Sequence, residues 1–300
     1  VMGPRVRRLF ILMGPGILGA GVYQINVLVG VRLASELPEG SISFLYFADR
    51  VNQLPLGVVG AAVGVALLPL LSRQLRTGDV ASARDSQNRA IEFAMLLTVP
   101  AAAALVVIAG PVITILFQRG AFDAADATAT AAALAAFALG LPAYVLVKAL
   151  APGFFAREDT ATPVKIAAAA LVLNVVAALA LMPSFAHVGI ALAAAISSWF
   201  NAGMLALLLY RRGLLDPDPR LLQRLVRIVI AAALMAAGLW LGTRLLGGWL
   251  GHSNLAGAAA LAVLVMAGAG LYGVLAQLLR ATSLPEMRAM MRRGGTGGDA

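Results

Sequence analysis

The sequence predicts an all-α polytopic membrane protein with eight transmembrane helices. Of its 300 residues, 61% are hydrophobic and only 12% are charged, whereas a soluble domain carries about 25% charged residues. The mean hydropathy is +0.89. Apolar runs of roughly 20 residues, the length that crosses a bilayer, recur along the chain. Together these observations exclude an ordinary soluble domain.

Eight segments have the length and composition of transmembrane helices. The first follows a basic start, but no small-residue cleavage site comes after its apolar run, so we interpret it as a span and not a signal peptide. The connections are rich in Gly, Pro and charged residues, which typically end helices. The predicted spans cover residues 9–34, 41–71, 91–117, 127–155, 164–182, 190–210, 225–246 and 255–279.

Three connections carry further structural signals. Residues 72–90 are polar, and the amphipathic pattern of their second half predicts a helix that lies at the membrane interface. Asp123 or Asp126 supplies an N-cap before the fourth span. Residues 281–300 form a tail that is basic and then Gly-rich, a composition typical of disorder at its end.

Basic residues are concentrated on one side of the predicted spans. That side holds 18 of the 23 lysines and arginines, the other side holds Arg32, Arg119 and Arg244, and Arg50 and Lys148 lie within the bilayer. The positive-inside rule then places both ends of the chain in the cytoplasm, as an even number of spans requires. The 18 residues are Arg5, Arg7, Arg8, Arg73, Arg76, Arg84, Arg89, Arg157, Lys165, Arg211, Arg212, Arg220, Arg224, Arg227, Arg280, Arg288, Arg292 and Arg293.

Composition also limits the classes of function. The net charge of +9 is explained by this asymmetry, so no nucleic-acid partner is predicted. The chain has no cysteine, and His187 and His252 are far apart, so neither a thiolate nor a multi-histidine metal site is expected. No nucleotide-binding motif is present. We therefore predict no cofactor, and any energy input would come from an ion gradient or the membrane potential.

The second predicted span carries Asp49 and Arg50 at membrane depth. An arginine there costs roughly 2.5–3.5 kcal/mol on insertion scales, so it normally faces a bundle interior or a wet cavity. Ser43, Tyr46 and Arg50 follow an i, i+3, i+7 spacing and share one helix face. We predict that this face lines a hydrated cavity. A structural ion pair of Arg50 with Asp49 or a neighbouring helix is the alternative, although adjacent helix residues point about 100° apart.

Four more polar residues lie within the predicted spans and are candidate cavity residues. Lys148 is about two turns from the cytoplasmic end of its span, so it either lines the cavity or extends to the interface. Gln24, Asn26 and Asn174 are amides near mid-depth. They either line the cavity or form hydrogen bonds between helices.

Six segments match the motifs of a known family. The combination of ADR (48–50) with VKALAPGF (147–154) and TPVKIA (162–167) is specific, whereas each alone is weak. With MGPGILGAGVYQIN (13–26), SFLYFADR (43–50), LPLGVVGAAVGVALLPLLS (54–72) and LFQRGAF (116–122), they resemble the MurJ/MviN family of bacterial lipid II flippases, in the multidrug/oligosaccharidyl-lipid/polysaccharide exporter superfamily. The resemblance is dense over residues 13–167 and weak in the last two spans.

The resemblance implies a specific domain organisation. The family has fourteen transmembrane helices, in two six-helix lobes and an additional C-terminal pair, and the eight spans resemble helices 7–14. Residues 1–212 would then form the second transport lobe, residues 213–280 the additional pair, and residues 281–300 a cytoplasmic tail. The first lobe, which would be a partner of this chain, is missing from it.

The resemblance also implies a function. Family members transport lipid II, the undecaprenyl-pyrophosphate-linked disaccharide-pentapeptide used in peptidoglycan synthesis, across the bacterial cytoplasmic membrane by alternating access. Arg50 falls on a required cavity arginine, Ser43 on a cavity-lining serine, and the last two helices on a groove for the lipid tail. Some members hold sodium, but Ala178 stands where a carboxylate would be expected, so no sodium site is assigned.

Three other functions remain open at this point. The first is export of another polyprenyl-linked glycan or a drug, although multidrug relatives lack these motifs. The second is a non-transporting membrane partner, because half a transporter cannot alternate access alone. The third is a membrane-embedded transferase, which would need clustered acidic or histidine side chains in or near the spans.

Overall fold

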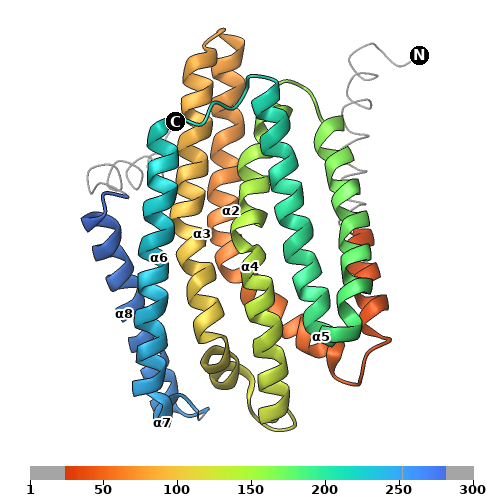
Figure 1. The fold of residues 1–300 in the computed structure, drawn as a ribbon, viewed down its shortest axis with the longest axis vertical. Coiled ribbons are helices and arrows are strands. Elements are labelled where there is room, and N and C mark those ends of the chain that lie inside the picture. Colours follow the sequence, from red (N-terminus) through yellow and green to blue (C-terminus); the bar gives the residue numbers. More distant parts are fainter. Residues whose placement is uncertain (1–23, 252, 282–300) are drawn as a thin grey trace, which may run out of the picture.

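The computed structural model describes residues 24–251 and 253–281, and within these ranges the chain is helical and contains no β-strand. This confirms the all-α prediction. An apolar helix at Gln24–Ala34 comes first. It is followed by α2 (Ser41–Arg76), α3 (Val80–Phe117), α4 (Ala124–Phe155), α5 (Ala161–Arg211), α6 (Pro219–Leu245), α7 (Gly247–Leu250) and α8 (Leu255–Leu278), which form an elongated bundle (Figure 1).

Five helices, α3, α4, α5, α6 and α8, are long and apolar enough to cross a membrane. Their positions agree with predicted spans three to eight, because α5 contributes two of these. The second span corresponds to α2. Part of the first predicted span and the tail at 282–300 lie outside the described residues, so the full count of eight stays a prediction.

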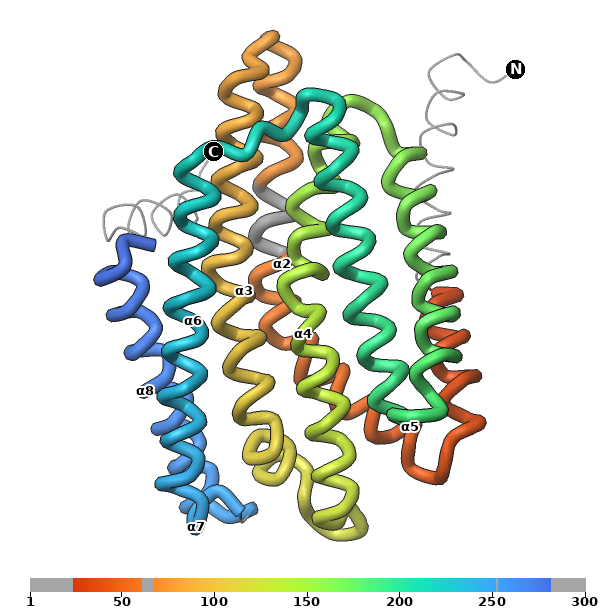
Figure 2. The backbone as a smooth tube through the Cα atoms, in the orientation of Figure 1, coloured from red at the N-terminus to blue at the C-terminus, as the bar shows by residue number. Residues whose placement is uncertain are grey.

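The helix α5 folds back on itself. A straight helix of its 51 residues would be roughly 75 Å long, far more than the roughly 30 Å hydrocarbon core. Ala186 has φ 47° and ψ −130°, which are not helical values, and the chain reverses there. Figure 2 shows the two limbs running side by side, and Ala178 and Ile190 from opposite limbs share one buried cluster. The two spans predicted at 164–182 and 190–210 are therefore the limbs of this hairpin.

Gly189 allows the close approach of these limbs, and its replacement should destabilise the protein. A Cβ atom at Gly189 would lie 2.7 Å from the carbonyl carbon of Leu181 and 2.8 Å from its oxygen. These are backbone atoms that cannot rotate away, so we expect Gly189→Ala to cost about 1–3 kcal/mol. Gly203→Ala is the matched control on α5, because nothing lies within 4 Å of the added atom there. Thermal unfolding of the purified variants measures the difference; equal midpoints would contradict this account of the hairpin.

The helix α3 is longer than the sequence predicts. The sequence predicts that the amphipathic part of residues 72–90 lies at the membrane interface, but the structure continues it into the third span as one helix from Val80 to Phe117. Asp79 caps this helix by accepting a hydrogen bond from the backbone N–H of Ser82 (3.0 Å). The predicted helix is present, but its placement as a separate segment at the interface is wrong, because its apolar face, which includes the buried Ala83, packs against α2 at Leu67 and Leu71.

The pair α6 and α8 packs on α3 at one side of the bundle. Met235 and Leu239 of α6 and Leu264 of α8 belong to the same buried cluster as Ile108 and Ile113 of α3. At the other end of α8, the Tyr272 hydroxyl donates a hydrogen bond to the Leu96 carbonyl of α3 (2.7 Å). The additional pair is thus joined to the rest of the bundle mainly through α3.

A buried carboxylate also fixes α6 to α3. The Glu92 side chain, 8% exposed, accepts charged hydrogen bonds from Arg89 of its own helix and from Arg224 of α6. Arg89 also pairs with Asp218, the N-cap residue of α6. A carboxylate buried in this way needs such partners, because its desolvation otherwise costs several kcal/mol.

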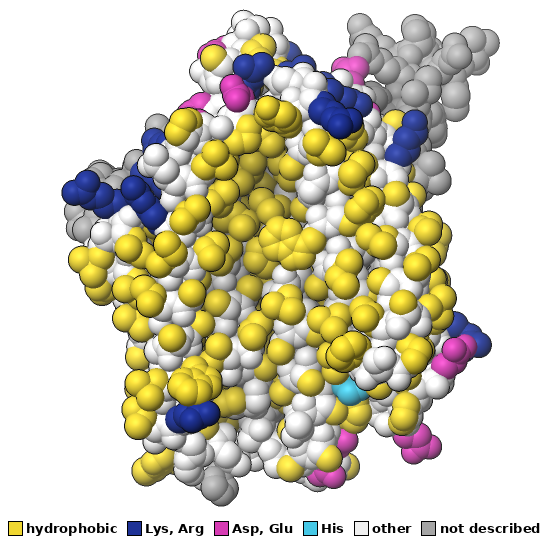
Figure 3. All heavy atoms as spheres, viewed as in Figure 1, with side chains coloured by type: hydrophobic (Ala, Val, Ile, Leu, Met, Phe, Trp, Pro, Cys, Tyr) yellow, Lys and Arg dark blue, Asp and Glu magenta, His cyan; other side chains and the backbone are white. Residues whose placement is uncertain are grey.

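Charged side chains gather at one end of the molecule, where the α2–α3, α4–α5 and α5–α6 connections lie (Figure 3). We call this the basic end. A broad band of hydrophobic side chains covers the middle of the same view. Among the described residues, the opposite end carries Arg32, Arg119 and Arg244. This distribution is typical of a protein embedded in a bilayer.

Candidate functional site

One face of α2 points away from the bundle and carries the polar residues singled out in the sequence. Ser43, Tyr46 and Arg50 are all exposed, whereas Ala48 and Asn52 on the opposite face are buried. The guanidinium carbon of Arg50 lies 4.8 Å from the centre of the Tyr46 ring. This cation–π contact is geometrically favourable and orients the guanidinium along the helix surface. The predicted shared face is therefore present.

Asp49 lies beside this face and not on it. It is partly buried, and its carboxylate accepts a hydrogen bond from the Gln53 side chain one turn further along α2. Among the described residues, Asp49 and Arg50 form no ion pair. The adjacent positions point in different directions, as helix geometry requires. Asp49 can lower the cost of the nearby cation through space without contacting it.

Lys148 reaches the same helix from α4. Its side chain lies over Gly60, where an added Cβ atom would be 2.8 Å from both the Cδ and the Nζ of Lys148. Gly60 follows Arg50 by ten residues, which corresponds to roughly 15 Å along a helix. Lys148 is exposed, but Gly60 is buried, and ten residues of helix turn it roughly 80° away from Arg50 around α2. The structure thus places Lys148 against a buried position of α2, beside the predicted cavity face and far from direct contact with Arg50.

The three candidate amide residues, Gln24, Asn26 and Asn174, do not lie on the Arg50 face of α2. The Nδ2 of Asn174 donates a hydrogen bond to the Oδ1 of Asn26 (2.6 Å), which joins α5 to the helix Gln24–Ala34. Asn174 is only 8% exposed, so this contact has the geometry of an interhelical polar bond. Gln24 is exposed on the same short helix. These residues are on a different part of the bundle surface from Arg50, and the structure does not bring the eight candidates into one cluster.

Sequence reasoning missed the Glu92 network. A signal existed, because Glu92 is a carboxylate at the start of an apolar run with Arg89 three residues before it. The contributions of Arg224 and Asp218 could not be found from spacing, since they are more than 120 residues away along the chain. Within residues 24–251 and 253–281, no group of three or more His, Asp or Glu side chains could hold a metal ion.

An apolar groove lies between α6 and α8, with a cavity volume of about 340 Å³. Three glycines keep it narrow at the base: added Cβ atoms at Gly238, Gly242 and Gly268 would lie 2.5–2.7 Å from leucine methyl groups. No charged residue lines it among the described residues. The lining residues are Gly238, Leu239, Gly242, Leu245, Leu246, Val263, Leu264, Ala267, Gly268 and Leu271.

The fold is similar to that of several membrane transporters of known structure. A structure titled "Lipid II flippase MurJ, inward closed conformation" superposes with a TM-score of 0.75 at 22% identity, covering 91% of this chain and 54% of that one. A multidrug resistance MATE family transporter of the MOP superfamily, in an outward-facing conformation, gives a TM-score of 0.59 at 16% identity, covering 88% and 62%. These likenesses show the class of fold: a helical bundle arranged as in these membrane transporters.

The particular family follows from the sequence. The family model described as lipid II flippase MurJ matches residues 1–280. A probable lipid II flippase MurJ of Rhizobium meliloti (strain 1021) is 43% identical over 295 residues, which cover 98% of this chain and 55% of the relative. The lipid II flippase MurJ of Burkholderia cenocepacia is 35% identical over 236 residues, covering 79% and 46%. The chain belongs to the MurJ family, and it spans about half the length of the curated relatives it matches.

Proposed function

We propose that this chain forms the second transport lobe and the additional helix pair of a flippase that moves lipid II from the cytoplasmic to the outer leaflet of the bacterial cytoplasmic membrane. The observation that carries the proposal is the outward face of α2, where Arg50 is exposed beside Tyr46 and Ser43 on an otherwise apolar bundle. Family membership supplies the substrate class.

The chemistry of Arg50 suits this substrate. A guanidinium exposed to lipid tails would be costly, so its face needs a wet, polar environment. The planar fork of arginine can bind two phosphate oxygens at once, and it stays charged at any physiological pH. We propose that Arg50 contacts the pyrophosphate of lipid II inside a cavity that a first lobe completes, with Lys148 as a second cation of the same cavity.

The groove between α6 and α8 suits the lipid tail. A polyprenyl chain is apolar and flexible, and a cavity of about 340 Å³ lined by Leu, Val, Ala and Gly would receive part of it. The headgroup would then travel through the cavity while the tail stays in an apolar environment. The groove lies on the pair of helices that follows the lobe. This position supports separate binding sites for the headgroup and for the lipid tail.

The charge distribution supports an orientation with the basic end in the cytoplasm. Cytoplasmic connections are enriched in Lys and Arg, and the α2–α3, α4–α5 and α5–α6 connections of this chain show that enrichment. Both ends of the chain would then be cytoplasmic. We propose that the chain performs no covalent chemistry and that the membrane potential or an ion gradient drives the transport cycle.

Complementation tests the proposed function. The full-length protein that contains this chain is expressed in bacteria depleted of their own lipid II flippase, and we expect growth to be restored. Rescue in a strain that lacks instead the exporter of another polyprenyl-linked glycan, with no rescue of the flippase-depleted strain, would favour the alternative substrate. If neither strain is rescued although the protein is inserted in the membrane, the chain acts as a non-transporting partner.

A further inference from the structure

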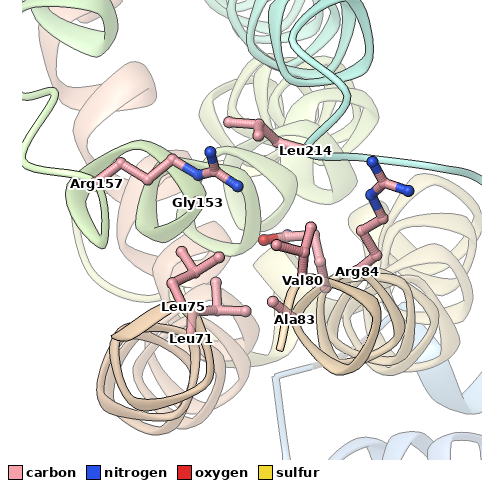
Figure 4. Close-up of a pocket in the computed structure, with 9 residues that line it drawn as sticks. Leu71, Leu75, Val80, Ala83, Arg84, Gly153, Arg157 and Leu214 are labelled. Atoms are coloured by element: carbon pink, nitrogen blue, oxygen red, sulfur yellow. The ribbon is translucent and has the colours of Figure 1, made fainter. Parts of the chain in front are cut away.

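A small pocket at the basic end lies outside both the α2 face and the α6–α8 groove. It is enclosed by the end of α2, the beginning of α3, the end of α4 and the α5–α6 connection (Figure 4). Among its lining residues the charged ones are Arg84 and Arg157, and no carboxylate is present. The lining residues are Leu71, Leu75, Val80, Ala83, Arg84, Gln87, Gly153, Arg157 and Leu214.

Arg84 is held in a fixed position. Its Nε and Nη2 donate hydrogen bonds to the carbonyl oxygen of Gly213, at 2.9 Å and 2.6 Å. Both bonds go to a neutral acceptor, so they orient the guanidinium without neutralising it. A cation held this way binds an anion with little loss of side-chain entropy.

Arg157 reaches the pocket from the opposite side. It follows the last turn of α4, and in Figure 4 its guanidinium extends across the pocket toward Gly153, while Arg84 stands at the other edge. Partial burial, together with the nearby positive charge of Arg84, lowers the pKa of Arg157. Within the described part of the chain, the side chain of Arg157 forms no hydrogen bond or ion pair, and only its backbone N–H is bonded, to the Phe154 carbonyl (3.0 Å). Two like charges therefore face one pocket.

Two other arginines at this end are neutralised by carboxylates, whereas no carboxylate lines this pocket. Arg212 contacts the Asp159 carboxylate (2.6 Å), and Arg89 contacts both Glu92 and Asp218. Where the chain supplies no carboxylate, an external anion would remove the repulsion between the two guanidinium groups and satisfy their remaining N–H donors.

We propose that Arg84 and Arg157 form a binding site for a phosphate group at the basic end of the bundle. Guanidinium groups favour phosphate because several N–H donors match its oxygens. The cavity volume of about 10 Å³ has room for roughly one water molecule, so the phosphate lies across the mouth between the two arginines. Leu71, Leu75 and Leu214 provide apolar walls beside it. The phosphate belongs either to the headgroup of an anionic phospholipid or to a soluble ion. The site is independent of the transported substrate.

The test compares Arg157→Gln with a matched control in the full-length protein. Arg157 is exposed and outside the helix, so its replacement leaves the core intact; Arg84 is less suitable because it holds Gly213. The control is Arg211→Gln, which removes one exposed arginine from the last turn of α5 at the same end, away from the pocket. Binding of phosphatidylglycerol, with phosphatidylcholine as reference, is measured by native mass spectrometry or by the shift in thermal unfolding.

We expect the wild-type protein and Arg211→Gln to bind phosphatidylglycerol preferentially. We expect Arg157→Gln to bind it about tenfold more weakly, which is the loss of affinity that removal of one charged hydrogen bond causes. If millimolar inorganic phosphate displaces the lipid or gives the same Arg157-dependent shift, the soluble ion is the source of the phosphate; if only the lipid does, the headgroup is. Equal binding by all three proteins, or an equal loss in both variants, would overturn the proposal.

Discussion

Replacing Arg50 with alanine is expected to abolish growth of flippase-depleted bacteria while the protein remains inserted in the membrane. Arg50 is exposed on α2 and packs on the Tyr46 ring, and among the described residues it has no ion-pair partner. Its loss should therefore leave the fold intact and remove the cation that we assign to the pyrophosphate. An interaction of a charged group made only with the transported anion is worth roughly 1.5–3 kcal/mol or more.

Two further variants test whether growth depends on the charge of Arg50, on the shape of its guanidinium group, or on the loss of any arginine. Arg50→Lys keeps the charge but loses the planar fork, so we expect partial growth. Arg32→Ala removes an arginine at the opposite end that pairs with Glu36 (2.8 Å) on an exposed surface, and it should grow normally. Membrane insertion is checked by immunoblotting of washed membranes. Normal growth of Arg50→Ala would contradict the assignment of this residue to the substrate.

Replacing Glu92 with glutamine is expected to have the largest effect on stability. Glu92 is nearly buried and its carboxylate is shared by Arg89 and Arg224. Without that carboxylate, two guanidinium groups are left close together in a site with little water, and breaking such a buried ion pair costs about 3–5 kcal/mol. Because the network joins α6 to α3, the additional helix pair should also lose its fixed position.

The comparison with an exposed carboxylate isolates the effect of burial. Asp85 also pairs with Arg89, at 3.4 Å, but its side chain is 68% exposed. Asp85→Asn should cost less than about 1 kcal/mol, as exposed ion pairs do. Thermal unfolding in detergent is measured for both variants under identical salt. If the two midpoints fall by the same amount, the buried network does not hold α6 on α3.

The parts of the fold that could be predicted are those set by local hydrophobicity. The spans expected at 225–246 and 255–279 agree closely with α6 and α8, because long apolar runs between polar connections leave few alternatives in a bilayer. The beginning of the third span was not predictable in the same way. Whether residues 80–90 lie flat or continue α3 depends on their contacts with α2 and α4, which hydropathy does not contain.

In the candidate site, too, some features follow from the local sequence and others depend on the tertiary arrangement. The exposed face with Ser43, Tyr46 and Arg50 follows from helix periodicity alone. In contrast, the contact of Lys148 with Gly60 and the hydrogen bond between Asn26 and Asn174 need the tertiary arrangement, since each joins two helices. Arg84 near the start of α3 and Arg157 after α4 lie in arginine-rich stretches of sequence, and only the structure distinguishes them from neighbours that are paired with carboxylates.

The central claim is that the outward face of α2 lines a hydrated cavity and does not face lipid tails. Water accessibility of a single thiol tests it directly, because the chain contains no cysteine and any thiol elsewhere in the full-length protein can be replaced first. Leu54 lies on this face one turn after Arg50 and is 66% exposed, whereas Val172 of α5 is 63% exposed on another side of the bundle.

Leu54→Cys and Val172→Cys are therefore treated with a membrane-impermeant maleimide in permeabilised membranes. We predict that the thiol at position 54 reacts readily and that lipid II protects it, while the thiol at position 172 stays unreactive. A thiol at position 54 that reacts no faster than the one at position 172 would show that this face meets lipid, and it would contradict the proposed cavity.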